Sequence, residues 1–222
     1  IKDNRKLDVQ KEYDILYDKL KLYIKTFKFY YKILKKVNLD IWEMQDDFRY
    51  NNGDKVKLCL KIIEDNDRRF RIKKKINNLT NSSLKEQKGY KLRKAFILTH
   101  LGLGDNINCI GAVRYLSTCY DEVLVVCKKK YKKNLELFYN DDDNIKLYPV
   151  QEDSDISPKL GCSLEKFKSV TNGMDLFLSG AHCLNKTPSS YDNLPLNFYD
   201  DMDIDKKYCR EYFHINTPNE AY

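Results

Sequence analysis

Apolar residues recur at alternating steps of four and three near the start of the chain, which is the spacing of a coiled-coil heptad. The pattern runs through more than four heptads, at Val9, Tyr13, Leu16, Leu20, Tyr23, Phe27, Tyr30, Leu34, Val37 and Ile41. We call these ten positions the heptad seam. Asn51-Asn52-Gly53-Asp54 then predicts a turn. A second amphipathic helix should follow, with its inward face at Val56, Cys59, Leu60, Ile63, Phe70 and Ile76. We therefore expect an antiparallel helical hairpin, with the seam buried against the second helix or a second copy.

The periodicity changes after residue 90. Ala95–Thr99 is a short apolar run typical of a buried strand, and Glu122–Cys127 is another. The segment Asn106–Leu116 between them predicts a helix with one apolar face, formed by Ile107, Ile110, Val113 and Leu116. Glycines at 102 and 104 separate the first strand from this helix. The order of strand, glycine turn, helix and strand is the opening of a Rossmann-like unit.

Later segments continue this α/β pattern. Residues 131–139 predict a helix, Ile145–Val150 a third strand and Met174–Ser179 a fourth. We expect residues 91–222 to form a Rossmann-like domain with a parallel sheet, preceded by a helical domain over residues 1–90. Charge supports that boundary, because residues 1–90 hold 23 Lys and Arg against 14 Asp and Glu, whereas the remainder holds 17 against 19.

The glycine turn is the main candidate for chemistry. Gly102 and Gly104 allow a tight reversal and a close approach of ligand to backbone, although a turn with no ligand remains the alternative. Asp105 beside a helix N-terminus is stabilised as an anion, and it would repel a diphosphate there. It therefore suits a proton acceptor. The third glycine position of a dinucleotide fingerprint is Ile107, and no carboxylate ends the second strand. Nicotinamide, flavin and S-adenosylmethionine are thus disfavoured, and we expect no cofactor.

Further candidate residues lie where predicted strands end. His100 and Asn106 flank the glycine turn, and His182 follows the fourth strand on the edge that also holds Asp105. Lys128 begins a lysine run after the second strand, where it could contact a substrate phosphate or simply face solvent. A surface-loop role is the alternative for His182. The three histidines and seven cysteines show no zinc spacing, so we expect no metal.

The run Leu103-Gly104-Asp105-x-Ile107, between an apolar strand and an amphipathic helix, resembles the N-terminal domain of GT-B glycosyltransferases of the heptosyltransferase-like group, including relatives in large DNA viruses and bacteria. The similarity covers roughly residues 91–222 and continues through Gly111–Leu116, Tyr120–Val126, Tyr139–Val150 and Phe198–Met202. The resemblance implies that Asp105 is the catalytic base. It also implies a nucleotide sugar as co-substrate and a glycan or other hydroxyl acceptor, bound near His100, Gly102, Leu103, Gly104, Asn106, Lys128 and His182.

In GT-B enzymes a second Rossmann domain holds most of the donor, and no second set of alternating strands and helices follows here. Either the polypeptide continues beyond Tyr222, or the donor half has been lost. The second case favours the alternative function, a non-catalytic structural or interaction protein in which the helical part drives assembly, either as a homo-oligomer or with another protein. The helical part itself resembles a helical domain of unknown function in bacteria and viruses, through Trp42–Asp47, Asn66–Phe70, Lys73–Asn77 and Ser83–Lys88.

Composition narrows the class and location. Hydrophobic residues make up 42% and charged residues 33%, and no apolar stretch is long enough to cross a membrane. The odd number of cysteines without a C-x-x-C pair favours reduced thiols and a cytoplasmic location. Abundant Lys, Asn, Ile and Tyr are typical of A/T-rich genomes, including large DNA viruses, which would place the protein in host cytoplasm or a virion. The basic run at Arg68–Lys75 contains a single aromatic residue, Phe70, which is assigned to the inward face of its helix, so nucleic-acid binding through stacking is not expected.

Overall fold

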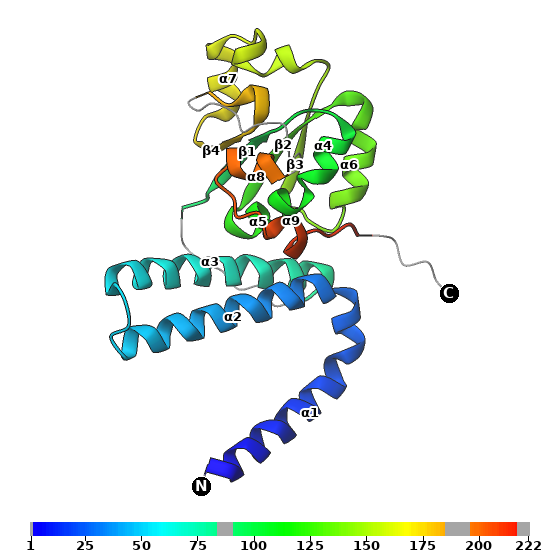
Figure 1. Cartoon of the computed structure of the whole chain (residues 1–222). Helices are drawn as coiled ribbons and strands as arrows, with labels where there is room; N and C mark the ends of the chain where they lie inside the picture. The colour runs from blue at the N-terminus through cyan, green and yellow to red at the C-terminus, as the bar shows by residue number, and fades with distance from the viewer. Residues whose placement is uncertain (1, 84–90, 185–195, 217–222) are drawn as a thin grey trace. The chain divides into compact units, whose positions relative to one another are not determined.

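The computed structural model describes residues 2–83, 91–184 and 196–216, with side chains from residue 7 onward. Clustering of contacts divides the chain into two compact units, residues 1–87 and 88–222, coloured from blue to cyan and from green to red in Figure 1. The division lies close to the boundary expected at residue 90. The first unit is helical and the second is α/β, so each is described separately.

The helical unit contains α1 (Lys2–Thr26), α2 (Lys28–Arg49) and α3 (Lys55–Leu79). Helices α2 and α3 pack against each other as the predicted hairpin. The turn between them has positive φ at Asn51 and Gly53, and the Asp54 carboxylate caps α3 by accepting hydrogen bonds from the Val56 and Lys57 N–H groups. The Asn-Asn-Gly-Asp segment therefore forms the predicted turn.

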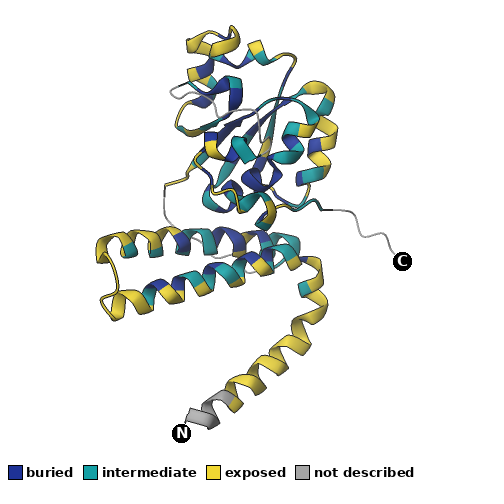
Figure 2. Cartoon of the chain, viewed as in Figure 1, coloured by how far each residue is buried: buried dark blue, intermediate teal, exposed yellow. Residues whose placement is uncertain are grey.

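Only the second half of the heptad seam is covered by the chain itself. Phe27 has non-helical backbone angles between α1 and α2, so one long helix becomes two. The seam residues Tyr30, Val37 and Ile41 of α2 are buried and Leu34 is partly buried, whereas the seam residues of α1 are exposed (Figure 2). The inward face predicted for α3 is wrong over its first half. Val56, Cys59, Leu60 and Ile63 are exposed and lie off the face that packs on α2.

The α/β unit contains one parallel sheet with the order β3-β2-β1-β4. Its strands are β1 (Lys94–Leu98), β2 (Glu122–Lys128), β3 (Ile145–Val150) and β4 (Met174–Leu178), at or within two residues of the predicted bounds. The helices between and after them are α4 (Leu103–Asn108), α5 (Ile110–Cys119), α6 (Lys132–Tyr139), α7 (Leu164–Thr171), α8 (Leu196–Asp201) and α9 (Tyr208–Glu211). Strand order reverses between β1 and β4, which is the switch point of a doubly wound fold.

Both faces of the two central strands, β1 and β2, are buried. Ala95 and Ile97 of β1 belong to an apolar cluster with α5 and α6, whereas the alternate residues Phe96 and Leu98 belong to a second cluster that includes Phe167 of α7. Burial on both faces explains why the strands read as continuous apolar runs. In the described residues, no helix is both long enough and apolar enough to cross a bilayer.

The helix predicted over residues 106–116 begins earlier and is divided in two. Helix α4 starts at Leu103, and Cys109 separates it from α5. The Tyr199 hydroxyl donates to the Asn108 carbonyl at 3.1 Å and accepts from the Ala112 N–H at 3.1 Å. One phenol from a distant helix therefore satisfies backbone groups beside the break, a role that no local pattern predicts.

Candidate functional site

Four strands end at one edge of the sheet, and most of the predicted site residues lie there. In open parallel sheets, ligands bind outside the carboxyl ends of the strands at the switch point, which here lies between β1 and β4. His100 follows β1 and His182 follows β4, while Lys128 is the last residue of β2. The structure therefore brings together residues from three separate segments of the chain.

Asp105 is the third residue of α4, directly after the glycine turn. Its carboxylate lies against Gly102 and accepts a hydrogen bond from the Gly102 N–H. Burial raises the pKa of Asp105, and the nearby His100 and the Gly102 N–H oppose that rise only in part. The carboxylate is therefore a stronger base than an exposed aspartate, while it also caps its own helix.

The other residues of the turn divide into two groups. Gly104 is exposed, with open space where a side chain would begin. Leu103 packs on the apolar core, and buried Asn106 donates from Nδ2 to the Gly102 carbonyl at 2.8 Å. Leu103 and Asn106 therefore hold the turn together. Their predicted contacts with substrate stay predictions, as does that of Gly102.

His100 packs against the turn that follows β4. Its Nε2 accepts a hydrogen bond from the Ala181 N–H at 3.3 Å, and its ring contacts the rings of His182 and Phe198. Gly180 makes this approach possible, because it has a φ of +57° and a Cβ there would overlap the His100 ring. The Gly180 N–H donates to a carboxylate oxygen of Asp201 at 2.7 Å. Two N–H groups of this turn are thus already used by side chains.

His182 is buried rather than a surface-loop residue. Its side chain is 1% exposed, and neither ring nitrogen has a hydrogen-bond partner within the described part of the chain. Burial lowers the pKa of His182 to about 4, against the opposing effect of Asp153, whose Oδ2 lies 3.8 Å from Nε2. The imidazole is therefore neutral at physiological pH and can accept or donate one hydrogen bond.

Lys128 does not simply face solvent. Its Nζ lies 3.1 Å from Asp153 Oδ1 and 3.2 Å from Glu152 Oε2, both in the segment that follows β3. These carboxylates raise the pKa of Lys128 and compensate its charge. A substrate phosphate would have to compete with them, which weakens the predicted phosphate contact. Asp153 consequently links Lys128 to His182 across the ends of three strands.

Asp153 and Asp201 are site residues that sequence reasoning missed. Asp153 follows the predicted third strand directly, so its place at the ligand edge could have been inferred from the strand pattern alone. Asp201 lies in α8 and reaches the turn after β4 only through the fold. A surface pocket beside β4 is lined by Leu178, Cys183 and Asp201, among others, but not by Asp105. In the described residues, no group of three or more His, Cys, Asp or Glu side chains could hold a metal ion.

Residues 2–97 match the model of a family of unknown function (DUF6165). The matched region is less than half of the chain, and it includes the three helices of the helical unit and most of β1. No curated protein and no solved structure matches the sequence.

Proposed function

We propose that the α/β unit is the acceptor side of a glycosyltransferase, in which Asp105 removes a proton from an acceptor hydroxyl. One observation carries this proposal. Asp105 is a partly buried carboxylate with a raised pKa, and it lies beside the switch point of a parallel sheet. General bases work best when their pKa is moved toward the working pH, and burial moves this one in that direction.

The reaction follows from the position of the base. The acceptor oxygen gives its proton to Asp105 and forms a bond with the anomeric carbon of a nucleotide sugar. The bond between that carbon and the donor phosphate breaks, and the diphosphate leaves with the electron pair. The configuration at the anomeric carbon is inverted, because attack and departure occur on opposite faces. Gly104, which leaves open space beside Asp105, supports the approach of a bulky acceptor.

The chemistry of this edge favours an acceptor over a donor diphosphate. Asp105 carries negative charge at the glycine turn, the Gly180 and Ala181 N–H groups bind Asp201 and His100, and Lys128 is paired with two carboxylates. A diphosphate would meet few available donors among the described residues and one repulsive charge. We therefore expect groups outside this edge of the sheet to hold the nucleotide.

The decisive experiment is Asp105→Asn in the complete protein as encoded. Asparagine keeps the shape and can still accept the hydrogen bond from Gly102, but it cannot take the proton. We expect nucleoside diphosphate release, measured with a panel of nucleotide sugars and oligosaccharide acceptors, to fall about 100- to 10,000-fold. Glu165→Gln is the matched control, because Glu165 is an exposed carboxylate in the first turn of α7. Transfer by Asp105→Asn at the control rate would exclude Asp105 as the base.

A second candidate function is non-catalytic assembly, favoured by a different observation. Helix α1 exposes a long row of apolar side chains, although the hairpin behind it is already packed. Exposed apolar surfaces of this size usually mark an interaction site. If the protein acts only in assembly, Asp105→Asn should leave assembly unchanged, so the same variant separates the two functions.

A further inference from the structure

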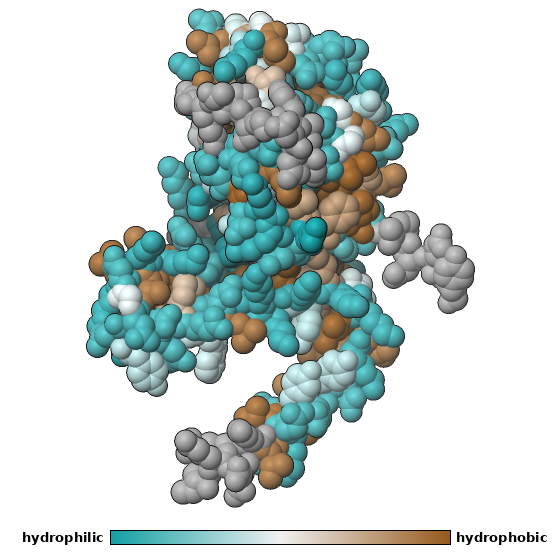
Figure 3. Space-filling model, viewed as in Figure 1, coloured by the Kyte–Doolittle hydropathy of each residue, from teal (hydrophilic) through white to brown (hydrophobic). Residues whose placement is uncertain are grey.

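Helix α1 presents an apolar face that the chain itself does not cover. Its nine large apolar residues from Leu7 to Tyr23 are exposed to between 46% and 72%: Leu7, Val9, Tyr13, Ile15, Leu16, Tyr17, Leu20, Leu22 and Tyr23. Figure 3 shows apolar side chains interrupting the polar surface of this helix. Five of the nine are positions of the heptad seam. Because most helical stability in proteins comes from packing of an apolar face rather than from local propensity, we expect a partner to cover this one.

The spacing of the exposed residues indicates what covers them. Val9, Tyr13, Leu16, Leu20 and Tyr23 keep the alternating four–three steps that α2 continues at Tyr30, Val37 and Ile41, where α3 covers them. A heptad seam is complementary to another helix with the same repeat, because the knobs of one fit the holes of the other. A second copy of α1 carries the same heptad repeat and is therefore the partner helix that fits the seam.

Charge and area agree with self-pairing. The positions that flank the seam are Gln10, Glu12, Tyr17, Lys19, Ile24 and Thr26, which carry one charge of each sign. No block of like charge therefore opposes pairing of two copies, and the uncharged Tyr17 and Ile24 widen the contact. Half-exposed side chains of this size leave roughly 100 Å² each. The five exposed seam residues and Tyr17 supply about 600 Å² per copy, at the low end of the roughly 600–1,000 Å² that each partner contributes to a standard interface. Leu7, Ile15 and Leu22 lie on other sides of the helix and are not counted.

We propose that α1 is a self-association helix, which joins two copies of this chain through the seam from Val9 to Tyr23. The pairing is independent of the chemistry at Asp105. It predicts a dimer of 26.4 kDa chains in solution. It also predicts that the helicity of α1 depends on protein concentration, because the helix gains its packing only in the dimer.

The test is the mass of the full chain by sedimentation equilibrium between about 1 and 100 µM, which covers the weak, micromolar end for protein interfaces. Leu16→Glu with Leu20→Glu puts charges into the seam of both copies and should weaken association by about 100-fold or more. Lys11→Gln with Lys25→Gln is the matched control, since it changes net charge by the same amount at exposed positions off the seam. The control should associate as the unmodified chain does.

A charge-swap experiment keeps the result independent of folding defects. Leu16→Lys with Leu20→Lys should also be monomeric, but an equal mixture with the glutamate variant should form a heterodimer, because each seam then meets the opposite charge. Retained melting of both variants, followed by near-UV circular dichroism, would show that the packed units are intact. An unmodified chain that stays monomeric at 100 µM, or a glutamate variant that dimerises as the control does, would overturn self-association through α1.

Discussion

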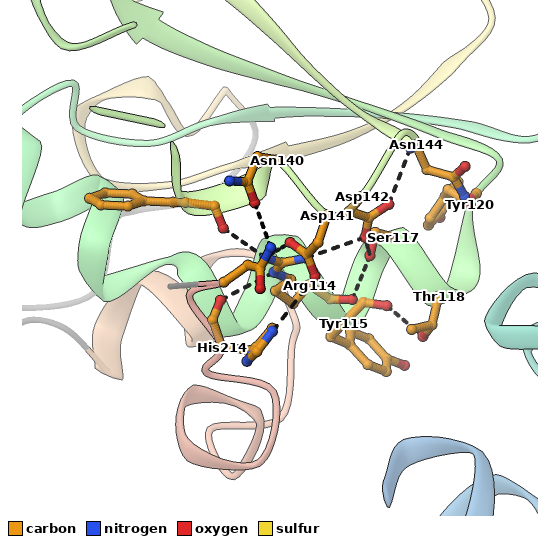
Figure 4. Close-up of polar contacts among 12 residues, drawn as sticks. Arg114, Tyr115, Ser117, Thr118, Tyr120, Asn140, Asp141, Asp142, Asn144 and His214 are labelled. Atoms are coloured by element: carbon orange, nitrogen blue, oxygen red, sulfur yellow. Dashed lines mark hydrogen bonds and ion pairs between the residues drawn. The ribbon is translucent and has the colours of Figure 1, made fainter. Parts of the chain in front are cut away.

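Arg114 Nη2 lies 2.6 Å from Asp141 Oδ1, and the two side chains are 0% and 3% exposed. Figure 4 shows the network around this pair, in which Arg114 also donates to the carbonyls of Phe138 and His214. Asp142 lies nearby and accepts a hydrogen bond from Ser117 at 2.8 Å. The guanidinium of α5 therefore joins the end of α6 to the segment that follows α9. Its surroundings are polar enough to hold a charge that burial would otherwise penalise heavily.

Breaking this pair should destabilise the α/β unit strongly. Arg114→Met leaves two buried carboxylates without their cation, and Asp141→Asn leaves the guanidinium undercompensated, so each should lower the free energy of unfolding by about 3–5 kcal/mol. Asp143→Asn is the control, because Asp143 is exposed two positions away. Urea denaturation followed by near-UV circular dichroism, to which the tyrosines of this unit contribute, measures the free energy of unfolding of both variants and the control. A loss below 1 kcal/mol for Asp141→Asn would mean that the pair contributes little.

Acid should weaken the same network. Burial alone would raise the pKa of Asp141, but the hydrogen bond from His214 and the charge of Arg114 outweigh it and hold the pKa well below its usual range. The unfolded state therefore takes up a proton at a higher pH than the folded state does. The stability that Asp141 contributes is complete above its ordinary pKa near 3.8 and is lost as pH falls below that value.

His182 should make stability depend on pH in a different window. Its pKa is lowered to about 4 by burial, from an ordinary value of 6.5. Between these values the unfolded state binds a proton and the folded state does not, so the free energy of unfolding decreases as pH falls from 6.5 to 4. The decrease is on the order of 3 kcal/mol. His182→Gln should remove it in urea denaturation at pH 7, 6, 5 and 4.5. If plots of the free energy of unfolding against pH ran parallel for the variant and the unmodified chain, they would contradict the burial of a neutral imidazole.

The strands of the α/β unit were predictable because each one is a short, mainly apolar run between turn residues, and in β1 and β2 both faces are buried. Ile145–Val150 has the predicted bounds, and β1 and β2 differ from prediction by one residue at one or both ends. The division at Cys109 could not be predicted, since Tyr199 lies ninety residues away and its hydroxyl satisfies backbone groups beside the break. Local periodicity cannot distinguish a continuous helix from one that a distant side chain interrupts.

The helical unit shows a different limit of prediction from sequence. A heptad pattern indicates that a face is apolar, but it does not say which helix covers it. The same repeat is buried in α2 and exposed in α1, because α3 accompanies only α2. For α3, apolar spacing at Val56, Leu60 and Ile63 suggested an inward face that is exposed. In both cases the sequence identified surfaces that need a partner without identifying the partner.

The positions of the candidate site residues were predictable from sequence, whereas their contacts were not. Asp105, His100, Lys128 and His182 were each found from their position after a strand, and all lie at the edge that parallel topology predicts. The burial of His182 and the pairing of Lys128 were not predictable. They depend on two 3-10 turns: Asp153–Asp155, which a local capping box between Glu152 and Asp155 holds, and Gly180–His182, which distant His100 and Asp201 hold.

Gly180 should be required for the packing of His100. Gly180→Ala places a Cβ into the His100 ring and also strains a backbone with a φ of +57°. Gly173→Ala is a matched control, because Gly173 has a φ of +71° but open space around it. Both variants should lose about 1 kcal/mol from backbone strain, and Gly180→Ala should lose about 1–3 kcal/mol more from overlap. Equal melting temperatures for the two variants would show that the ring moves without cost.

The pH dependence of sugar transfer gives the sharpest test of Asp105, and it rests on the proposed activity. Because burial raises the pKa of this carboxyl above its ordinary 3.8, the inactive protonated form should persist to higher pH than for an exposed aspartate. A base must be deprotonated to act, so kcat/KM should fall as pH decreases through this raised pKa. Glu165→Gln should keep that acid limb, whereas the residual activity of Asp105→Asn should lack it. An acid limb that survives in Asp105→Asn would assign the base to another group at this edge, with His182 the first alternative because burial keeps its imidazole neutral down to about pH 4.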